Sequence, residues 1–171
     1  MAKIILETTR LFLREFTKAD APLILQLNND PDVLKYLHEA RINNEQEALT
    51  VLLTVILPQY KNHLGRWAIH IKESNEFIGW CGLKYRADRD EIDLGYRFKK
   101  SAWGKGFATE TASATLDHGF KKLKIPLITG RAHIENIASL SVLEKIGMQF
   151  RKEEIVDDCQ VRTYTMVNPY M

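Results

Sequence analysis

The spacing of apolar residues divides the chain into strand-like and helix-like segments. Residues 91–98 alternate polar and apolar positions almost without exception, which predicts a strand with one buried face. Residues 105–122 instead repeat apolar positions every four residues, which predicts a helix with one apolar face. The residues of that face are Ala108, Ala112, Leu116 and Phe120.

The same criteria place the remaining elements. Strands are predicted at residues 10–16, 67–71, 77–85, 127–132, 149–156 and 161–167. Helices are predicted at residues 17–28, 44–61 and 137–146, with either a turn or a short helix from residue 29. This order predicts one α+β domain over residues 1–171, with a central mixed sheet and helices on both faces.

Composition narrows the range of functions without naming one. Apolar residues make up 45% of the chain and charged residues 27%, as in an ordinary globular protein. A net charge of +2 gives no reason to expect direct nucleic-acid binding. The longest apolar run, residues 49–57, is too short to cross a bilayer, and the N-terminus has no apolar leader. We therefore expect a cytoplasmic protein without a membrane partner, as a monomer or a homodimer.

The potential metal-binding residues form no recognisable motif. Cys81 and Cys159 are far apart and match no zinc spacing, and the five histidines show no ligand pattern either. We expect no metal site.

The turn between the strand at 91–98 and the following helix is the most informative segment. Gly104 and Gly106 leave room for a ligand to approach the backbone, and the helix start offers unpaired N–H groups and a positive dipole end. Such a turn suits phosphates, although two glycines can equally form a simple tight turn. The nucleotide-binding P-loop and the dinucleotide fingerprint are both absent.

A second informative segment spans residues 134–148. It reads as an amphipathic helix that Asn136 caps and Gly147 ends. Capping explains Asn136 fully, and a ligand contact by the same side chain is compatible with it.

Five segments in this order and spacing resemble the GNAT superfamily of acetyl-coenzyme A-dependent N-acetyltransferases, and most closely its ribosomal-protein-alanine N-acetyltransferase branch. They are residues 7–14, 29–33, 94–96, 103–110 and 136–147. The resemblance extends over nearly the whole chain. It implies a mostly antiparallel sheet in which the strands at 91–98 and 127–132 are parallel neighbours that splay apart.

The resemblance also implies how the coenzyme is held. The family's pyrophosphate signature, Gln/Arg-x-x-Gly-x-Gly/Ala, falls on Trp103-x-x-Gly106-x-Ala108, with Trp in place of the usual first residue. The pantetheine arm would lie between the splayed strands. The implied coenzyme contacts are Phe98, Trp103, Gly104, Lys105, Gly106, Phe107, Ala108, Thr109, Asn136 and Ser139.

The sequence departs from the family at the expected catalytic acid. Many members place a tyrosine seven residues after the asparagine, whereas this chain has Leu143. Ser139 is a candidate substitute, although a hydroxyl in the first turn of a helix also has a purely structural explanation.

The implied reaction is attack of a primary amine on the acetyl thioester. Deprotonating a lysine amine at pH 7 costs roughly 4–5 kcal/mol, but an α-amine only about 1–1.5 kcal/mol, so a protein or peptide N-terminus needs only a weak base. Asp93 and Glu91 are the candidates, since their spacing places both on one strand face. A solvated polar face would explain both equally well.

Three alternatives stay open at this point. The chain could bind acetyl-coenzyme A without turnover, because the usual tyrosine is missing. It could acetylate a small-molecule amine such as a polyamine or an antibiotic. It could also bind the phosphates of an unrelated nucleotide at the glycine turn.

Overall fold

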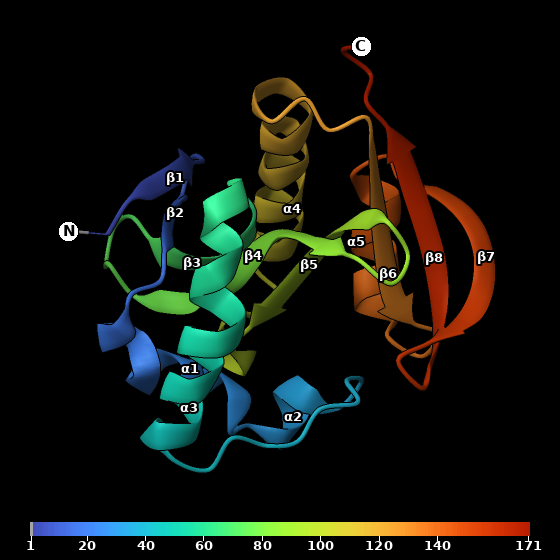
Figure 1. Cartoon of the computed structure of the whole chain (residues 1–171). Coiled ribbons are helices and arrows are strands. Elements are labelled where there is room, and N and C mark those ends of the chain that lie inside the picture. The colour runs from blue at the N-terminus through green and yellow to red at the C-terminus, as the bar shows by residue number, and fades with distance from the viewer. Residues whose placement is uncertain (1) are drawn as a thin grey trace.

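A single mixed sheet of eight strands organises the molecule, which is described for residues 2–171 by a computed structural model (Figure 1). The strand order is β1-β2-β3-β4-β5-β6-β8-β7, and β5–β6 is the parallel pair. The strands are β1 (Ile4–Glu7), β2 (Leu11–Glu15), β3 (Gly65–Ile71), β4 (Phe77–Arg86), β5 (Glu91–Phe98), β6 (Leu127–His133), β7 (Gln149–Val156) and β8 (Cys159–Val167). The predicted α+β class is confirmed.

Helices cover both faces of the sheet, as the sequence predicts (Figure 1). They are α1 (Ala21–Asn28), α2 (Pro31–Leu34), α3 (Glu45–Val51), α4 (Phe107–Asp117) and α5 (Ile137–Lys145). Alternate residues of β3 separate the two cores: Trp67 and Ile69 belong to the core under α4 and α5, and Ala68 to the core under α1 and α3.

Several predicted boundaries were wrong, each for a local reason. Strand β1 was missed because its four residues show no alternation and are recognisable only beside β2. Helix α4 begins at Phe107 rather than at residue 105, since Gly106 has a left-handed backbone (φ +80°). The helix predicted at 44–61 changes to a π turn at Leu52 and then to a 3₁₀ turn, and Pro58 in that last turn has no N–H for an α-helical bond. The short helix that follows Asp30 is confirmed as α2.

The sheet divides between β5 and β6. These strands pair at only two positions, Asp93 with Thr129 and Leu94 with Gly130. Beyond them, β5 stays paired with β4 as far as Phe98, and β6 stays paired with β8. The predicted splay is therefore confirmed, and it opens a gap inside an otherwise continuous sheet.

A buried arginine ties the strands together where they begin to separate. Arg131 of β6 has a side chain only 8% exposed, and its guanidinium lies 2.7 Å from the Glu91 carboxylate and 3.3 Å from that of Asp93, both on β5. The same group lies 3.7 Å from Glu154 of β7 and donates to Thr163 of β8. Glu91 and Asp93 thus share one face, as predicted, and one cation connects four strands.

Replacing Arg131 with Met should leave Glu91 and Asp93 close together with the more distant Arg86, at 4.0 Å from Asp93, as their remaining partner. We expect the free energy of unfolding to fall by about 3 kcal/mol at neutral pH. Because the folded variant would bind protons more readily than the unfolded chain, its stability should fall as pH rises, so the deficit should be larger at pH 8 than at pH 5. Urea unfolding at both pH values measures this.

The exposed Arg162, which pairs with Glu153 at 3.0 Å, provides the matched control. Arg162→Met should change stability by less than about 1 kcal/mol. A deficit of Arg131→Met that is equal at pH 5 and pH 8 would contradict an electrostatic origin.

Candidate active site

A cavity of about 460 Å³ lies where β5 and β6 separate. Its walls come from strands β3 to β8, from α5 and from the loop that follows α2. Three of the predicted site residues line it: Asp93, Asn136 and Ser139. The fold therefore brings Asp93 into the same cavity as Asn136 and Ser139, which lie more than forty residues later in the sequence.

The turn before α4 presents a row of free backbone donors. Gly104 and Gly106 have φ values of +74° and +80°, and a Cβ on Gly104 would meet no protein atom within 4 Å. Within residues 2–171, no N–H group from Gly104 to Thr109 donates a hydrogen bond, and the first bond of the helix joins the Glu110 N–H to the Gly106 carbonyl at 3.1 Å. The geometry is that of an anion site at a helix N-terminus.

Arg10 of the β1–β2 connection braces this turn. Its guanidinium donates to the Lys105 carbonyl at 2.9 Å and to Glu110 at 2.8 Å, and it lies over the Phe107 ring. Although partial burial opposes ionisation, hydrogen bonds from Thr8 and Arg10 hold the pKa of Glu110 below its ordinary value. Glu110, the acidic residue in the first turn of α4, is therefore ionised, but the positive charge of Arg10 offsets its repulsion of an anion.

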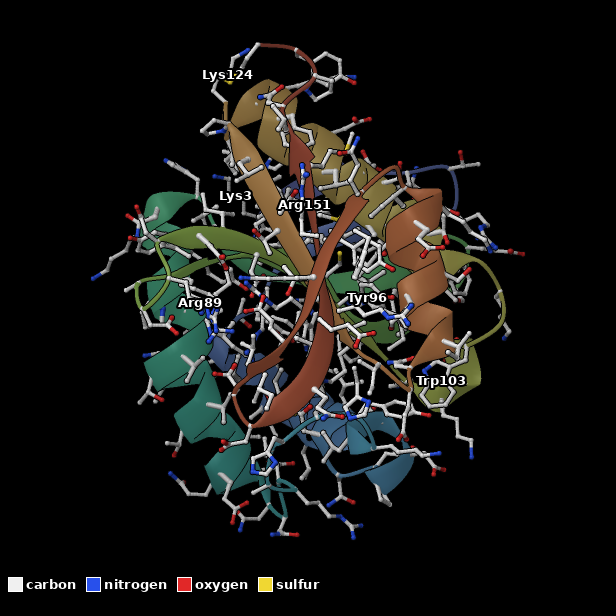
Figure 2. The ribbon with its side chains drawn as sticks, turned by 90° about the vertical axis from the view of Figure 1, so that its right-hand side faces the viewer. Lys3, Arg89, Tyr96, Trp103, Lys124 and Arg151 are labelled. Atoms are coloured by element: carbon white, nitrogen blue, oxygen red, sulfur yellow. The ribbon has the colours of Figure 1, made fainter. Side chains whose placement is uncertain are left out.

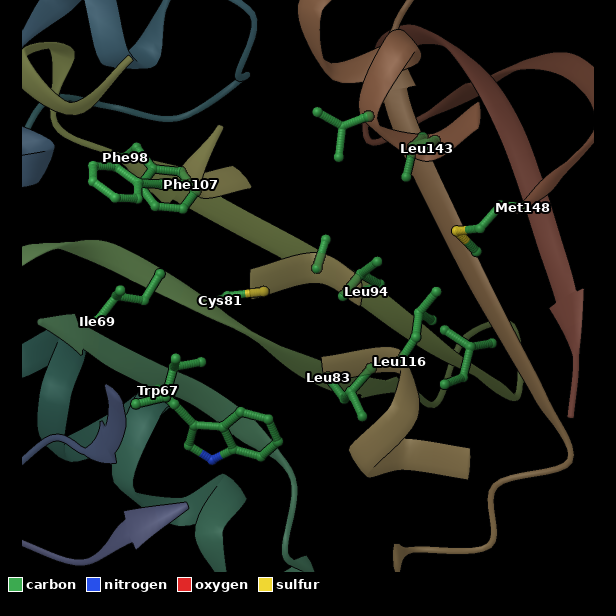
Figure 3. Packing of buried hydrophobic residues seen from close by; sticks show 14 of the residues in the cluster. Trp67, Ile69, Cys81, Leu83, Leu94, Phe98, Phe107, Leu116, Leu143 and Met148 are labelled. Carbon is green, nitrogen blue, oxygen red and sulfur yellow. The ribbon is translucent and has the colours of Figure 1, made fainter. Parts of the chain in front are cut away.

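The other residues predicted to contact the coenzyme differ in exposure. The side chains of Phe98 and Phe107 pack in the core, so only their backbones are available (Figure 3). Trp103 is 47% exposed, stands at the surface and donates its indole N–H to the Phe98 carbonyl at 3.0 Å (Figure 2). Lys105 is exposed, and Ala108 and Thr109 are half-buried. All of residues 103–109 lie beyond the end of β5 and outside the cavity lining.

Of the two candidate bases, only Asp93 lines the cavity. Burial raises its pKa to about 6, against the opposing effect of Arg131 and Arg86. A carboxyl with that pKa is ionised at neutral pH and still basic enough to accept a proton. Glu91 is the closer partner of Arg131 and lies outside the lining.

Tyr96 of β5 is a site residue whose role the sequence did not reveal. Its hydroxyl donates to Ser139 Oγ at 3.0 Å, beside helix α5 (Figure 2). Burial raises the pKa of Tyr96 to about 12, so the phenol keeps its proton at neutral pH. In the sequence, Tyr96 lies in the apolar phase of a core-facing strand, and nothing local indicates a partner 43 residues away.

The start of α5 explains the two polar residues predicted there. Asn136 is the N-cap, because its side-chain oxygen accepts the Ser139 N–H at 3.3 Å. Leu143, which stands where many family members have tyrosine, is 3% exposed and packs against Gly130 and Met148 (Figure 3). The hydroxyls in this region therefore come from Tyr96 and Ser139.

Aromatic side chains also contribute to the cavity. Tyr36 and Trp80 line the cavity, whereas Trp67 is fully buried in the core and Tyr85 is exposed and bonded to Asp90. Two arginines also line the cavity next to Trp80, Arg66 and Arg97, and the sequence did not single them out.

Residues 2–171 contain neither a metal-ligand cluster nor a membrane-spanning helix. No cluster of three or more metal-ligating side chains is present in this part of the chain. None of its helices is long and apolar enough to traverse a bilayer.

The chain was compared with known families and structures. A family model described as an acetyltransferase (GNAT) domain matches residues 10–149. The uncharacterized N-acetyltransferase p20 of Bacillus licheniformis is 29% identical over 167 residues, 97% of this chain and 93% of the relative.

Solved structures share the fold at low sequence identity. The ribosomal L7/L12 α-N-protein acetyltransferase RimL, in complex with coenzyme A, gives a TM-score of 0.83 at 18% identity, covering 96% of this chain and 98% of that one. Spermidine N-acetyltransferase of Vibrio cholerae, in complex with coenzyme A and spermine, gives 0.79 at 18% identity, covering 94% and 96%. The match of the family model to most of the chain identifies this protein as a GNAT-family N-acetyltransferase.

Proposed function

We propose that this protein transfers the acetyl group of acetyl-coenzyme A to a primary amine, and that the amine is the N-terminal α-amine of a protein or peptide. One observation supports this above all others. The cavity in the divided sheet carries a carboxylate of raised pKa on one strand and a paired phenol and hydroxyl next to it, and the anion-binding turn follows the same strand.

The chain offers three features that fit the coenzyme. Free N–H groups of residues 104–109 would hold the pyrophosphate, with Lys105 and Trp103 at the rim. The unpaired edge of β5, residues 95–98, would pair with the amide groups of the pantetheine arm. Asn136 and Ser139 lie across the gap on α5. When bound, the coenzyme supplies an acetyl thioester, an electrophile with a thiolate leaving group.

Asp93 is the base in this proposal. The incoming ammonium gives one proton to Asp93, directly or through a water molecule, and Asp93 passes it to solvent. The nitrogen lone pair then forms the C–N bond and the C–S bond breaks. The amide nitrogen loses a second proton, and the sulfur gains one, so the products are an N-acetyl amide, a free thiol and the proton released to solvent.

The Tyr96–Ser139 pair acts next to the sulfur in this scheme. A phenol with a pKa of about 12 keeps its proton at neutral pH. In this scheme the O–H turns from Ser139 Oγ to the sulfur and stabilises the negative charge that develops there as the bond breaks. The pair thus takes the place of the tyrosine that Leu143 replaces. This weakens the alternative in which the domain binds the coenzyme without turnover.

The pKa of Asp93 favours an α-amine over an alkyl amine. Moving a proton from an α-amine with a pKa near 8 to a carboxylate with a pKa of about 6 costs about 3 kcal/mol, whereas an amine with a pKa near 10.4 costs about 6 kcal/mol. Small-molecule amines remain the second candidate class, since one structural neighbour is named as a spermidine N-acetyltransferase.

An acceptor screen tests the proposed activity. With acetyl-coenzyme A in excess, thiol release should be fastest with peptides that have a free α-amine and slower with spermidine and aminoglycosides. N-acetylated versions of the same peptides are the control and should release no thiol. Coenzyme binding without thiol release from any acceptor would show that the domain only binds the coenzyme.

Asp93→Asn tests the base. We expect kcat to fall at least about a hundredfold. In the native protein kcat should rise with pH and level off above about pH 6, as Asp93 loses its proton, and the variant should lack this rise. The matched control is Glu91→Gln, which also removes a carboxylate from Arg131 but lies outside the cavity lining, and which should lower kcat less than tenfold. Equal losses in the two variants would indicate a structural role for both.

Tyr96→Phe tests the donor near the sulfur. The variant keeps the ring and its packing, and kcat should fall roughly ten- to a hundredfold while the affinity for coenzyme A is unchanged. Ser139→Ala should have a smaller effect, because the phenol would remain. An unchanged kcat in Tyr96→Phe would exclude this group from the reaction.

A further inference from the structure

Two arginines line one end of the cavity, and both lie close to the same aromatic ring. Arg66 of β3 and Arg97 of β5 both line the cavity. Their guanidinium carbons lie 4.8 Å and 5.5 Å, respectively, from the ring centroid of Trp80 on β4. Trp80 itself packs over Gly95, where an added Cβ would lie 3.6 Å from the indole. The indole therefore lies against β5 and within cation–π distance of both guanidinium groups.

The hydrogen-bonding capacity of these arginines is only partly used. Arg97 donates from one terminal nitrogen to Asn28 and from the other to Glu39, at 2.9 Å for the latter, but its buried Nε–H has no partner. The side chain of Arg97 is only 6% exposed. Within residues 2–171, the Arg66 guanidinium forms neither a hydrogen bond nor an ion pair, and its described contact is the Trp80 ring.

The charges at this end of the cavity do not balance. Arg66 and Arg97 face one carboxylate, Glu39, which is 49% exposed on the loop after α2. The other cations of the lining, Arg86 and Arg131, are matched by Asp88, Asp157, Glu91 and Asp93. Burial, followed by the nearby charge of Arg97, lowers the pKa of Arg66.

We infer that the amine acceptor carries a carboxylate, which Arg66 binds with the positive charge of Arg97 beside it, while the amine lies near Asp93. A guanidinium donates to a carboxylate in a planar fork, and an arginine keeps its charge at any physiological pH. This inference rests on the proposed function and specifies its substrate class. A polyamine would place further positive charge against two arginines and is disfavoured.

The spacing along β5 indicates where the carboxylate lies in the acceptor. Asp93 and Arg97 are four residues apart on one strand face, which separates their Cα atoms by about 13 Å. Because side chains on one strand face stand roughly perpendicular to the sheet, we expect the charged groups to be separated by a comparable distance, which the amine and α-carboxylate of one free amino acid are too close together to bridge. An acidic side chain at the second or third position of an extended peptide fits better.

Matched peptides test this inference. Peptides with Asp or Glu at positions 2 and 3 should be acetylated with a kcat/KM at least about tenfold above that of the same peptides with Asn or Gln. Free alanine and alaninamide form a separate arm, and a preference for alanine over the amide would place the carboxylate next to the amine instead. Spermidine should be the poorest acceptor.

Arg66→Met should remove the preference for acidic peptides. We expect KM for the acidic peptide to rise about tenfold, with KM for acetyl-coenzyme A unchanged, so that the ratio between acidic and amide peptides approaches one. Arg66→Lys keeps the charge and should retain part of the preference. Arg151→Met, at an exposed position on β7, should retain all of it.

Calorimetry with N-acetylated product peptides supplies a readout that needs no turnover. The acidic product should bind the native protein more tightly than its amide counterpart, and Arg66→Met should bind both alike while melting and binding coenzyme A like the native protein. Equal binding of both peptides to the native protein, or a preference that survives Arg66→Met, would overturn the inference. Absence of thiol release from every acceptor would instead overturn the proposed function.

Discussion

The separation of β5 from β6 is the constraint on which the rest of the structure depends. A sheet that divides in its interior leaves backbone groups without strand partners and opens its core to solvent, and both effects destabilise the fold. Here two paired positions and the contacts of Arg131 hold the strands together where the gap begins. The separation opens the cavity and leaves one edge of β5 without a strand partner, and the turn before α4 follows the end of the same strand.

The residues of the cavity are organised by the alternation of β5. The face that carries Asp93 and Arg97 looks toward the half of the cavity lined by Trp80, whereas the face that carries Tyr96 looks toward α5. One strand thus supplies the proposed base, the proposed donor to sulfur and one of the two arginines, and a shift of one residue in its register would exchange these roles.

The sequence predicted most of what depends on local pattern. Alternation located β5, four-residue spacing located α4, and the glycines marked a turn whose left-handed backbone is now evident. The family resemblance added the splay, which no local pattern indicates. Strand β1 was missed because four residues without alternation carry too little information.

What the sequence could not predict depends on contacts between distant segments. The pair formed by Tyr96 and Ser139 joins a core-facing strand position to a helix start, and the separate patterns of these elements explain each residue without the other. In the sequence, Arg66 and Arg97 resemble ordinary surface arginines. Their common position beside Trp80 depends on the packing of β3, β4 and β5, which no local pattern specifies. The alternation correctly placed Glu91 and Asp93 on one strand face. It gave no indication that Glu91 would form an ion pair with Arg131 and lie outside the cavity lining.

The positions of the three tryptophans have a spectroscopic consequence. Trp67 is buried in the core, Trp80 forms part of the cavity wall near two guanidinium groups, and Trp103 is half-exposed on the turn before α4. An indole in solvent emits at longer wavelength than a buried one, and nearby cations quench its emission. The protein therefore carries one intrinsic fluorophore at each end of its site and a third in its core, so that variants keeping only Trp80 or only Trp103 would report occupancy of each end separately.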